Sequence, residues 1–175
     1  MKISRLEIPE VLLIEPNKYI DDRGCFSETF RFDIFRTFYA DTKFVQGNLV
    51  ESKKNVLRGL HYQKLNPQGK LVSVIEGKIF DVAVDIRKQS KFYGKWVGLE
   101  LSSDNHKQLY IPPGFAHGYC VLSPYSKVMY KCTDYYKKDD QYGIIWNDDK
   151  ININWPLEKP ILSDKDGKLP FFDKV

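Results

Sequence analysis

The sequence predicts an all-β sandwich or barrel, and three observations lead to this prediction. Between residues 56 and 134 the chain divides into short runs rich in β-branched and aromatic residues. Turn-forming sequences such as Glu76-Gly77 and Pro112-Pro113-Gly114 separate these runs. Short strands at this spacing, with such turns between them, are typical of sandwiches and barrels. The chain has 175 residues, enough for one sizeable core, so we expect a single domain over residues 1–175.

The N-terminal part of the chain predicts extended segments and one helix. Residues 11–14 are a short candidate for a buried strand. Residues 21–24 predict a turn, because Asp and Gly supply the local hydrogen bonds and the positive φ that turns need. Larger and smaller side chains alternate over residues 25–30, which predicts another strand. Residues 32–40 predict a helix that Asp33 would cap.

Extended structure resumes at residues 44–52. The polar side chains of Gln46 and Asn48 share one face there, which is more typical of a binding groove than of a core. The strands that follow are predicted at residues 56–63, 70–75, 78–87, 96–101, 108–111, 118–122 and 127–133. The remaining residues, 135–175, are polar with only short apolar pieces.

Composition and charge exclude some classes of partner. Hydrophobic residues make up 42% of the chain and aromatic residues 14%, as expected of a globular protein. The formal net charge is +4, and no basic block stands out, so we do not expect a nucleic acid partner. The mild basic excess suits an anionic small substrate.

Cysteine usage and the N-terminus bear on the compartment. Cys25, Cys120 and Cys132 are odd in number and form no CxxC pair, so they indicate neither a disulfide framework nor a zinc site. The first residues lack the apolar core of a signal peptide, and no apolar run approaches the roughly 20 residues of a membrane helix. We therefore expect reduced thiols in a cytoplasmic protein with no membrane partner.

The other candidate functional residues can be understood as partners of His61. A lone histidine is more often a core or surface residue, but His61 lies close in sequence to Arg58 and Lys70. His117 follows a Pro-Pro-Gly turn, and Tyr130 lies in another predicted strand. Taken singly, Lys70 could be a solvated turn lysine and Tyr130 a buried strand tyrosine. Together they suggest acid–base chemistry, because imidazole titrates near neutral pH.

Several long motifs resemble the dTDP-4-dehydrorhamnose 3,5-epimerases. They occupy residues 58–63 (RGLHYQ), 70–72, 80–87, 108–118 (QLYIPPGFAHG), 146–148 and 162–166 (LSDKD). The resemblance runs in order from about residue 3 to about residue 170. It implies a cupin-like jelly roll, a homodimer, no cofactor, and a nucleotide-diphosphate sugar with a 4-keto-6-deoxyhexose as substrate. It also suggests a role in making rhamnose or a related deoxysugar for a bacterial surface polysaccharide.

Epimerisation next to a ketone needs a base, an acid on the opposite face and a group that stabilises the enolate. We assign the base to His61. A carboxylate should hold its far nitrogen; the resemblance places Asp166 there, whereas the residues alone leave Asp81 and Asp85 as alternatives. These two share one face of residues 80–86, which lines either solvent or a polar cavity.

Candidates for the acid and for the enolate stabiliser are found with the help of the same resemblance. Tyr130 matches the acid of the family, and a phenol with a reference pKa of about 10 stays protonated at neutral pH. Lys70 is suited to the enolate oxygen, because a positioned cation acts where negative charge develops.

The remaining residues that the resemblance implies are substrate ligands: Arg23, Glu28, Gln46, Asn48, Arg58, His117 and Lys165. Arg23 and Glu28 are expected to act across the dimer. The family usually has Glu at the position of Gln141, so this residue bears on which nucleotide or sugar is preferred. Arg58 and His61 are three residues apart, and strict alternation would place them on opposite faces. We therefore predict an irregularity at Gly59.

Other functions remain alternatives. A relative that acts at C3 or C5 only, or on a GDP-linked or other nucleotide-linked sugar, could share the same base and acid. A non-catalytic sugar-nucleotide binding module would be expected to lack His61 or Tyr130, and both are present. A metal-dependent cupin would be expected to show His-x-His, whereas Gln63 stands two residues after His61, so we expect no metal.

Overall fold

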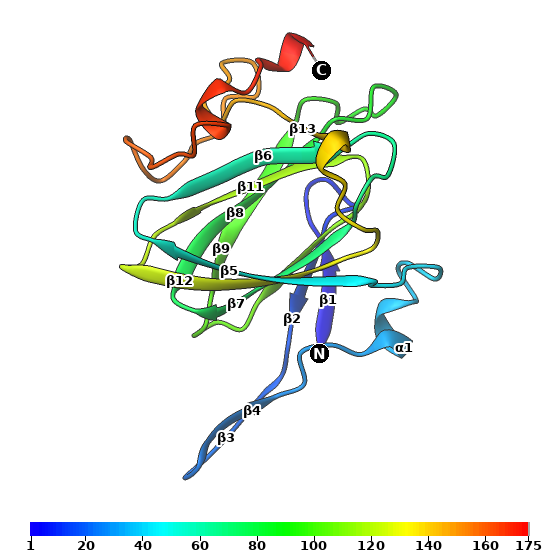
Figure 1. Ribbon diagram of the computed structural model, residues 1–175. Helices are drawn as coiled ribbons and strands as arrows, with labels where there is room; N and C mark the ends of the chain where they lie inside the picture. The colour runs from blue at the N-terminus through cyan, green and yellow to red at the C-terminus, as the bar shows by residue number, and fades with distance from the viewer. Residues whose placement is uncertain (175) are drawn as a thin grey trace.

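The computed structural model describes residues 1–174 and consists mainly of antiparallel strands in two facing sheets (Figure 1). The six-stranded sheet has the order β1 (Lys2–Arg5), β2 (Leu12–Glu15), β10 (Gln108–Ile111), β7 (Lys70–Glu76), β12 (Tyr125–Cys132), β5 (Gln46–Lys53). The five-stranded sheet has the order β13 (Gln141–Gly143), β6 (Leu57–Gln63), β11 (Phe115–Val121), β8 (Lys78–Asp85), β9 (Trp96–Ser102). The predicted all-β, cupin-like fold is confirmed.

The space between the sheets holds the main core. Val72 and Val128 of the six-stranded sheet pack there with Ala83 and Val121 of the five-stranded sheet. Strand alternation produces this arrangement, because every second side chain of each strand faces the partner sheet. Burial of apolar area at roughly 25 cal/mol per Å² then favours closing the two sheets on each other.

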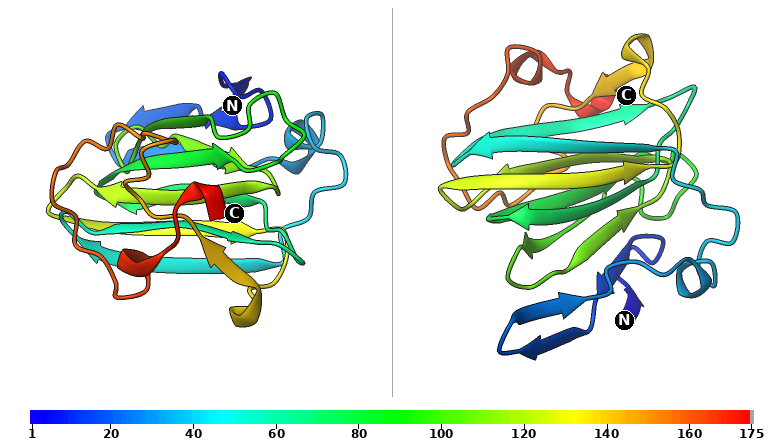
Figure 2. Two further views of the ribbon diagram at one scale, coloured as in Figure 1. Left: turned by 90° about the horizontal axis from the view of Figure 1, so that it is seen from above. Right: turned by 60° about the horizontal axis from the view of Figure 1, so that its bottom comes forward.

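The C-terminal part of the chain covers the other face of the five-stranded sheet. Figure 2 shows this segment, coloured orange to red, crossing that sheet. Val82 and Val84 of β8 pack there against Ile144, Ile151 and Phe172, so strands such as β11 are buried on both faces. The short 3-10 helices of this region are η1 (Lys138–Asp140), η2 (Asp166–Lys168) and η3 (Phe172–Lys174).

Asp81 and Asp85 lie on the opposite face of β8. Asp81 and Asp85 are both completely buried, so this face lines the interior and not solvent. The carboxylate of Asp85 accepts hydrogen bonds from Arg87 and Ser90, so it does not orient His61. Asp81 binds His117. Neither aspartate is the partner of His61.

The N-terminal region departs most from the sequence prediction. The strand predicted over residues 25–30 ends at Ser27, in a hairpin of β3 (Lys18–Asp21) and β4 (Gly24–Ser27) that projects from the barrel (Figure 1). The helix predicted over residues 32–40 is only α1 (Phe32–Phe35), followed by turns. The apolar spacing there reflects packing of Phe35 onto Tyr110 and not a longer helix.

The proposed helix cap is also wrong. Arg31 precedes α1 in an extended conformation, and Asp33 lies inside the first turn, where its carboxylate pairs with Arg31. A carboxylate in the first turn still favours a helix N-terminus, so the residue type was informative although its position was misread.

The predicted irregularity at Gly59 is confirmed. His61 pairs with His117, and Arg58 pairs with Tyr119, so β6 has one more residue than β11 between these two pairs. Gly59 has φ of 117°, and a Cβ atom there would lie 2.6 Å from the Cα of Gly118. Only glycine fits this close approach, and the extra residue lets Arg58 and His61 face the same cavity.

The three cysteines are not paired with one another in the described residues. Cys25 is exposed, whereas Cys120 and Cys132 are buried. Within residues 1–174, no helix has the length and apolar character that a membrane-spanning helix needs.

Candidate active site

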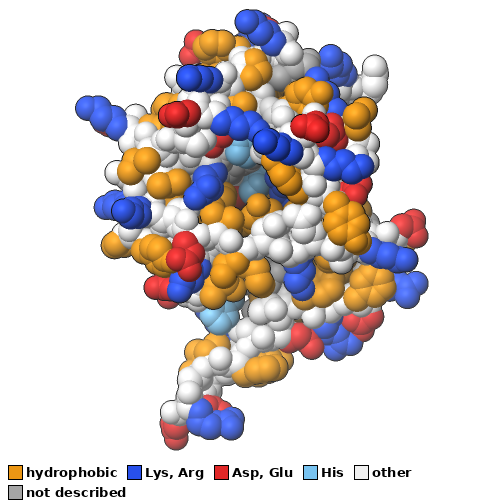
Figure 3. Space-filling view, in the orientation of Figure 1, with side chains coloured by type: hydrophobic (Ala, Val, Ile, Leu, Met, Phe, Trp, Pro, Cys, Tyr) orange, Lys and Arg blue, Asp and Glu red, His pale blue; other side chains and the backbone are white. Residues whose placement is uncertain are grey.

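Two adjoining cavities of about 250 and 290 Å³ open at one side of the barrel. They share His61, Lys70, Tyr130, Tyr136 and Gln141, so they form one continuous site. Figure 3 shows histidine side chains, coloured pale blue, inside a hollow on this face, with Lys and Arg side chains around it. The walls come from β5, β6, β7, β11, β12, β13, the residues just before β13 and the segment around η2.

His61 is held by a carboxylate from the far end of the chain. Its Nε2 lies 2.6 Å from Oδ1 of Asp166. Asp166 is almost fully buried, and Ser163 Oγ accepts a hydrogen bond from its backbone N–H. The backbone N–H of Gly59 donates to Oδ2 of Asp166 at 3.4 Å. The glycine irregularity therefore also helps to place the carboxylate behind the histidine.

The charge state of Asp166 follows from these contacts. Burial by itself raises the pKa of this carboxyl, but the hydrogen bond from His61 and the Gly59 N–H outweigh it, so the pKa lies below its ordinary value. An ionised Asp166 keeps a proton on Nε2 of His61. Nδ1 is then the ring nitrogen that can accept a proton from a ligand.

Lys70 belongs to a second chain of polar groups. Its Nζ lies 3.5 Å from Nδ1 of His117, and Nε2 of His117 lies 2.7 Å from Oδ1 of Asp81. An ammonium can only donate, so His117 accepts at Nδ1 and donates its Nε2 proton to Asp81. Burial, together with the nearby Lys70 charge, lowers the pKa of His117 despite Asp81. His117 is therefore neutral and acts as a fixed acceptor.

Desolvation of the ammonium lowers the pKa of Lys70, against the opposing effects of Cys132 and Asp81. The Lys70 side chain lines both cavities and is not a solvated turn residue. A cation held in such a poorly solvated position interacts strongly with a developing negative charge.

Tyr130 lies across the cavity from His61, on β12 of the opposite sheet. It lines both cavities and is partly exposed, whereas its neighbours on the same face, Val128 and Cys132, are buried. Burial raises the pKa of Tyr130 above its ordinary value, so the phenol is protonated at neutral pH. Tyr130 thus presents a protonated phenol to the site.

The structure brings most of the expected ligand residues into the site. Gln46 and Asn48 bond to each other at 3.0 Å, and both line one cavity, as their shared face predicted. Arg58 lines the other cavity, where its guanidinium donates to Oγ of Ser52 and the carbonyl of Glu51. Their roles in binding stay predictions.

Gln141 and Lys165 meet at the junction of the two cavities. Nζ of Lys165 donates to Oε1 of Gln141 at 2.6 Å, and the phenol of Tyr136 donates to the same oxygen at 2.9 Å. Tyr136 was not foreseen, because it lies in a segment with no strand periodicity. Tyr119 was also missed, although it alternates with His117 on β11, and that alternation was the available signal.

Arg23 and Glu28 lie outside this cavity. Arg23 is at the tip of the hairpin, where it pairs with Asp21 at 2.6 Å, and its side chain is 90% exposed. Glu28 follows the hairpin and is within 3.9 Å of Arg31. Neither residue lines the site of its own chain. Among residues 1–174, no group of three or more His, Cys, Asp or Glu side chains is arranged to hold a metal ion.

A carboxylate-held histidine, a phenol on the opposite wall and a desolvated ammonium around one cavity define an acid–base enzyme on a cupin-like barrel. Comparison with known proteins identifies the family. The sequence profile of the dTDP-4-dehydrorhamnose 3,5-epimerase family matches residues 5–174. The chain therefore belongs to this family, which places it among the carbohydrate epimerases, a class of isomerase.

Individual relatives agree with this. The dTDP-4-dehydrorhamnose 3,5-epimerase of Shigella flexneri is 52% identical over 169 residues, or 95% of this chain and 93% of that protein. The dTDP-6-deoxy-D-glucose-3,5-epimerase of Legionella pneumophila, solved with dTDP-4-keto-L-rhamnose, has a TM-score of 0.95 at 45% identity, over 99% of this chain and 94% of that one. A 3'-monoepimerase of Streptomyces bikiniensis, solved with dTDP-quinovose, has a TM-score of 0.91 at 28% identity, over 97% of this chain and 87% of that one.

Proposed function

We propose that this chain inverts C3 and C5 of a nucleotide-linked 4-keto-6-deoxyhexose, converting dTDP-4-dehydro-6-deoxyglucose into dTDP-4-dehydrorhamnose. The observation that carries the proposal is the placement of His61 and Tyr130 on opposite walls of one cavity, which Lys70 also lines from β7, the strand beside that of Tyr130. The names of the relatives support the substrate.

The first step is removal of a proton next to the ketone. Nδ1 of His61 takes the proton from C3 or C5, and the electron pair of the broken C–H bond moves into the enolate, leaving the negative charge on the C4 oxygen. His61 becomes an imidazolium whose charge is stabilised by Asp166 at 2.6 Å. Asp166 itself remains ionised.

Lys70 stabilises the enolate. Its ammonium is held by His117, and a neutral His117 leaves the full positive charge on Lys70 for the C4 oxygen. The ammonium is already desolvated, so little solvent reorganisation is needed when the charge develops.

Return of a proton from the opposite face completes each inversion. Tyr130 donates its phenolic proton to the carbon while the enolate returns to the ketone, and solvent then restores the protonation states of Tyr130 and His61. Solvent hydrogen therefore enters the product at every carbon that is inverted. The same groups serve C3 and C5 in turn, because both carbons flank the same ketone.

The substrate is anionic, and the site suits it. Arg58 and Lys165 provide a guanidinium and an ammonium for a diphosphate. Gln46 and Asn48 present amides that can bind sugar hydroxyls or a base. The three free thiols agree with a reducing cytoplasmic compartment for this biosynthesis.

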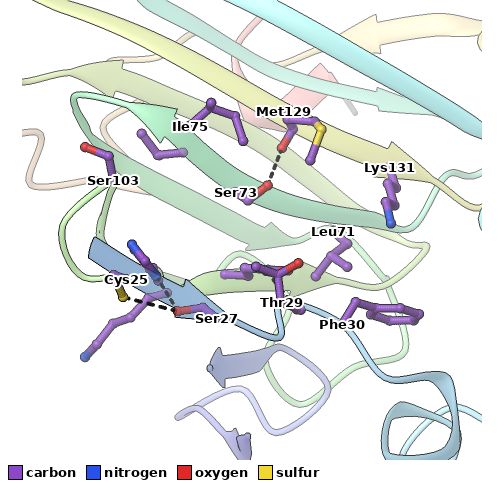
Figure 4. A pocket seen from close by; sticks show the side chains of 14 residues that line it. Cys25, Ser27, Thr29, Phe30, Leu71, Ser73, Ile75, Ser103, Met129 and Lys131 are labelled. Atoms are coloured by element: carbon purple, nitrogen blue, oxygen red, sulfur yellow. Dashed lines mark hydrogen bonds between the residues drawn. The ribbon is translucent and has the colours of Figure 1, made fainter. Parts of the chain in front are cut away.

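We further propose that the chain forms a homodimer through the outer face of its six-stranded sheet. Leu49, Ile75 and Met129 expose apolar surface there, and Phe26 of the hairpin is 68% exposed. Figure 4 shows the cavity between the hairpin and this sheet, which measures about 340 Å³. A second copy would cover this surface and bring Arg23 of the hairpin, and Glu28 just after it, near the neighbouring site.

Epimerisation at one carbon only is the second candidate, and the similarity to a 3'-monoepimerase favours keeping it. The same base and acid would suffice, with the sugar held so that only one carbon reaches His61. A non-catalytic binding module gains no support, since both proton-transfer groups face the cavity.

The test is hydrogen exchange with solvent. The protein is incubated with dTDP-4-keto-6-deoxyglucose in heavy water, and deuterium at C3 and C5 is followed by NMR. Incorporation at both carbons with inversion supports the proposal, one labelled carbon indicates a monoepimerase, and none refutes the substrate.

Variants test the assigned roles in the same assay. His61→Ala and Tyr130→Phe should each slow turnover at least about a hundredfold. Tyr125→Phe, on the same strand but outside the cavity, is the matched control. Near-normal turnover by His61→Ala would show that the base is a different residue.

A further inference from the structure

Gln141 occupies an unusual electrostatic position at the junction of the two cavities. Its Oε1 accepts hydrogen bonds from both Lys165, at 2.6 Å, and Tyr136, at 2.9 Å. Two donors on the oxygen fix the orientation of the amide, so its NH₂ group points away from both. Gln141 also pairs through its backbone with Gln63 of β6, so the residue is anchored in the sheet.

The cations that line the site have neutral partners. Lys165 binds the Gln141 amide, Arg58 binds a hydroxyl and a carbonyl, and Lys70 binds neutral His117. Within residues 1–174, the one carboxylate that lines the two cavities is Asp166, which is bound to His61. The site therefore keeps an excess of positive charge.

Other basic groups of the molecule are arranged differently. Lys78 pairs with Glu100 at 3.2 Å, and Arg87 pairs with Asp85 at 2.6 Å. At the position of Gln141, a carboxylate of the same length would likewise pair with Lys165. The amide gives the same hydrogen-bond geometry without the charge, so Lys165 is oriented but not neutralised.

We propose that Gln141 is a positioning residue that sets the affinity of the site for a diphosphate, by holding Lys165 in place while leaving its charge to the ligand. The inference rests on the proposed function in one respect, namely that the substrate is linked to a nucleoside diphosphate. It goes further by assigning the strength of anion binding to a neutral side chain.

The size of the effect follows from Coulomb's law. A carboxylate at this position would lie roughly 7 Å from a diphosphate bound at Lys165, and solvated charges at that distance repel each other even at the dielectric constant of bulk water, about 80. Two phosphate charges then correspond to about a tenfold loss of affinity. Salt at about 1 M should remove most of this difference, because the Debye length falls to about 3 Å.

The test compares the binding of dTDP and thymidine by calorimetry. Gln141→Glu should weaken dTDP binding about tenfold and leave thymidine binding within twofold, and in turnover the loss should fall on KM. Gln141→Met, which removes the hydrogen bonds without adding charge, should weaken dTDP binding less than threefold. Gln89→Glu makes the same charge change at an exposed position outside the site and should match the wild type.

Two results would overturn the inference. One is dTDP affinity of Gln141→Glu within twofold of the wild type. The other is an equal loss in Gln141→Glu and Gln141→Met, which would mean that hydrogen bonding and not charge matters. The affinity comparison does not depend on turnover. A wild-type protein that exchanges no solvent hydrogen would therefore refute the proposed reaction but not the role of Gln141 in anion binding.

Discussion

Replacing Asp166 by Asn tests the proposed mechanism most directly. The side chain keeps its size, but the ion at 2.6 Å from Nε2 of His61 is lost. The histidine must carry a positive charge after it takes the substrate proton. Charges roughly 4 Å apart interact by about 4 kcal/mol at an effective dielectric of about 20. A loss of this size from the transition state corresponds to about a thousandfold in rate.

A second effect acts in the same direction. The amide of Asn can donate a hydrogen bond, which would favour the tautomer with the proton on Nδ1 of His61. That tautomer cannot accept a proton from the substrate at the nitrogen that faces the cavity. The thousandfold figure is therefore a lower bound if the amide takes this orientation.

The assay is the rate of deuterium incorporation into substrate in heavy water, measured for wild type and Asp166→Asn at saturating substrate. Asp164→Asn is the control, because Asp164 is exposed two residues away and loses the same charge. Circular dichroism and melting temperature check that both variants fold. Retention of more than a tenth of the wild-type rate by Asp166→Asn would refute the role given to this carboxylate.

Three further predictions concern one residue of the site and two buried positions of the strands. Lys70→Met should abolish turnover yet raise the melting temperature by about 3 °C. Burial lowers the pKa of Lys70, and the variant removes the desolvation cost that this shift reflects. A lower melting temperature would contradict this prediction. Burial alone would raise the pKa of Asp85, but hydrogen bonds from Arg87 and Ser90 outweigh it, so the pKa lies below the ordinary value of 3.8. The ionised form of Asp85 therefore stabilises the fold above that pH. This stability is lost as the pH falls through the lowered pKa. Asp85→Asn should therefore cost about 3 kcal/mol at pH 6 and less at pH 2.5 in urea unfolding, whereas a constant difference would argue against the linkage. Gly59→Ala should lower the free energy of unfolding by at least about 2 kcal/mol, since its Cβ would clash with Gly118; unchanged denaturation midpoints would rule this out.

The two histidines of the site illustrate how the fold separates chemical roles. His61 and His117 are partners on adjacent strands β6 and β11, and each has a carboxylate on Nε2. His117 is buried beside an ammonium, which lowers its pKa and keeps it neutral. His61 is partly exposed to the cavity, where it can exchange a proton with a ligand. The same residue type is thus a fixed acceptor in one place and the proposed base in the other.

Much of the fold could be predicted because strand signals are local. Alternation and turn residues between 56 and 134 placed each of the predicted strands within a few residues of its position. The motif around His61 and the motif around His117 likewise identified the centre of the site. The irregularity at Gly59 followed from a contradiction within the sequence, since Arg58 and His61 could not otherwise share a face.

The prediction failed where packing between distant segments decides the structure. Residues 32–40 have helical spacing, but Phe35 packs against Tyr110 and the helix ends after one turn. The C-terminal residues were described as polar with short apolar pieces, yet those pieces cover one face of the five-stranded sheet. Neither outcome can be deduced from local periodicity, because each depends on a surface supplied by another part of the chain.

By itself, the sequence determined the strand pattern, the acid–base residue types and the resemblance to an epimerase family. The resemblance placed Asp166 behind His61, but the residues alone left Asp81 and Asp85 open, and the tertiary structure decided which carboxylate bonds to His61. Asp81 and Asp85 are nearer in sequence, but β8 directs them to His117 and Arg87. Asp166 is 105 residues from His61 and reaches it because the C-terminal segment folds back over β6. A hydrogen bond requires closeness in space, and here the packing of distant segments creates it.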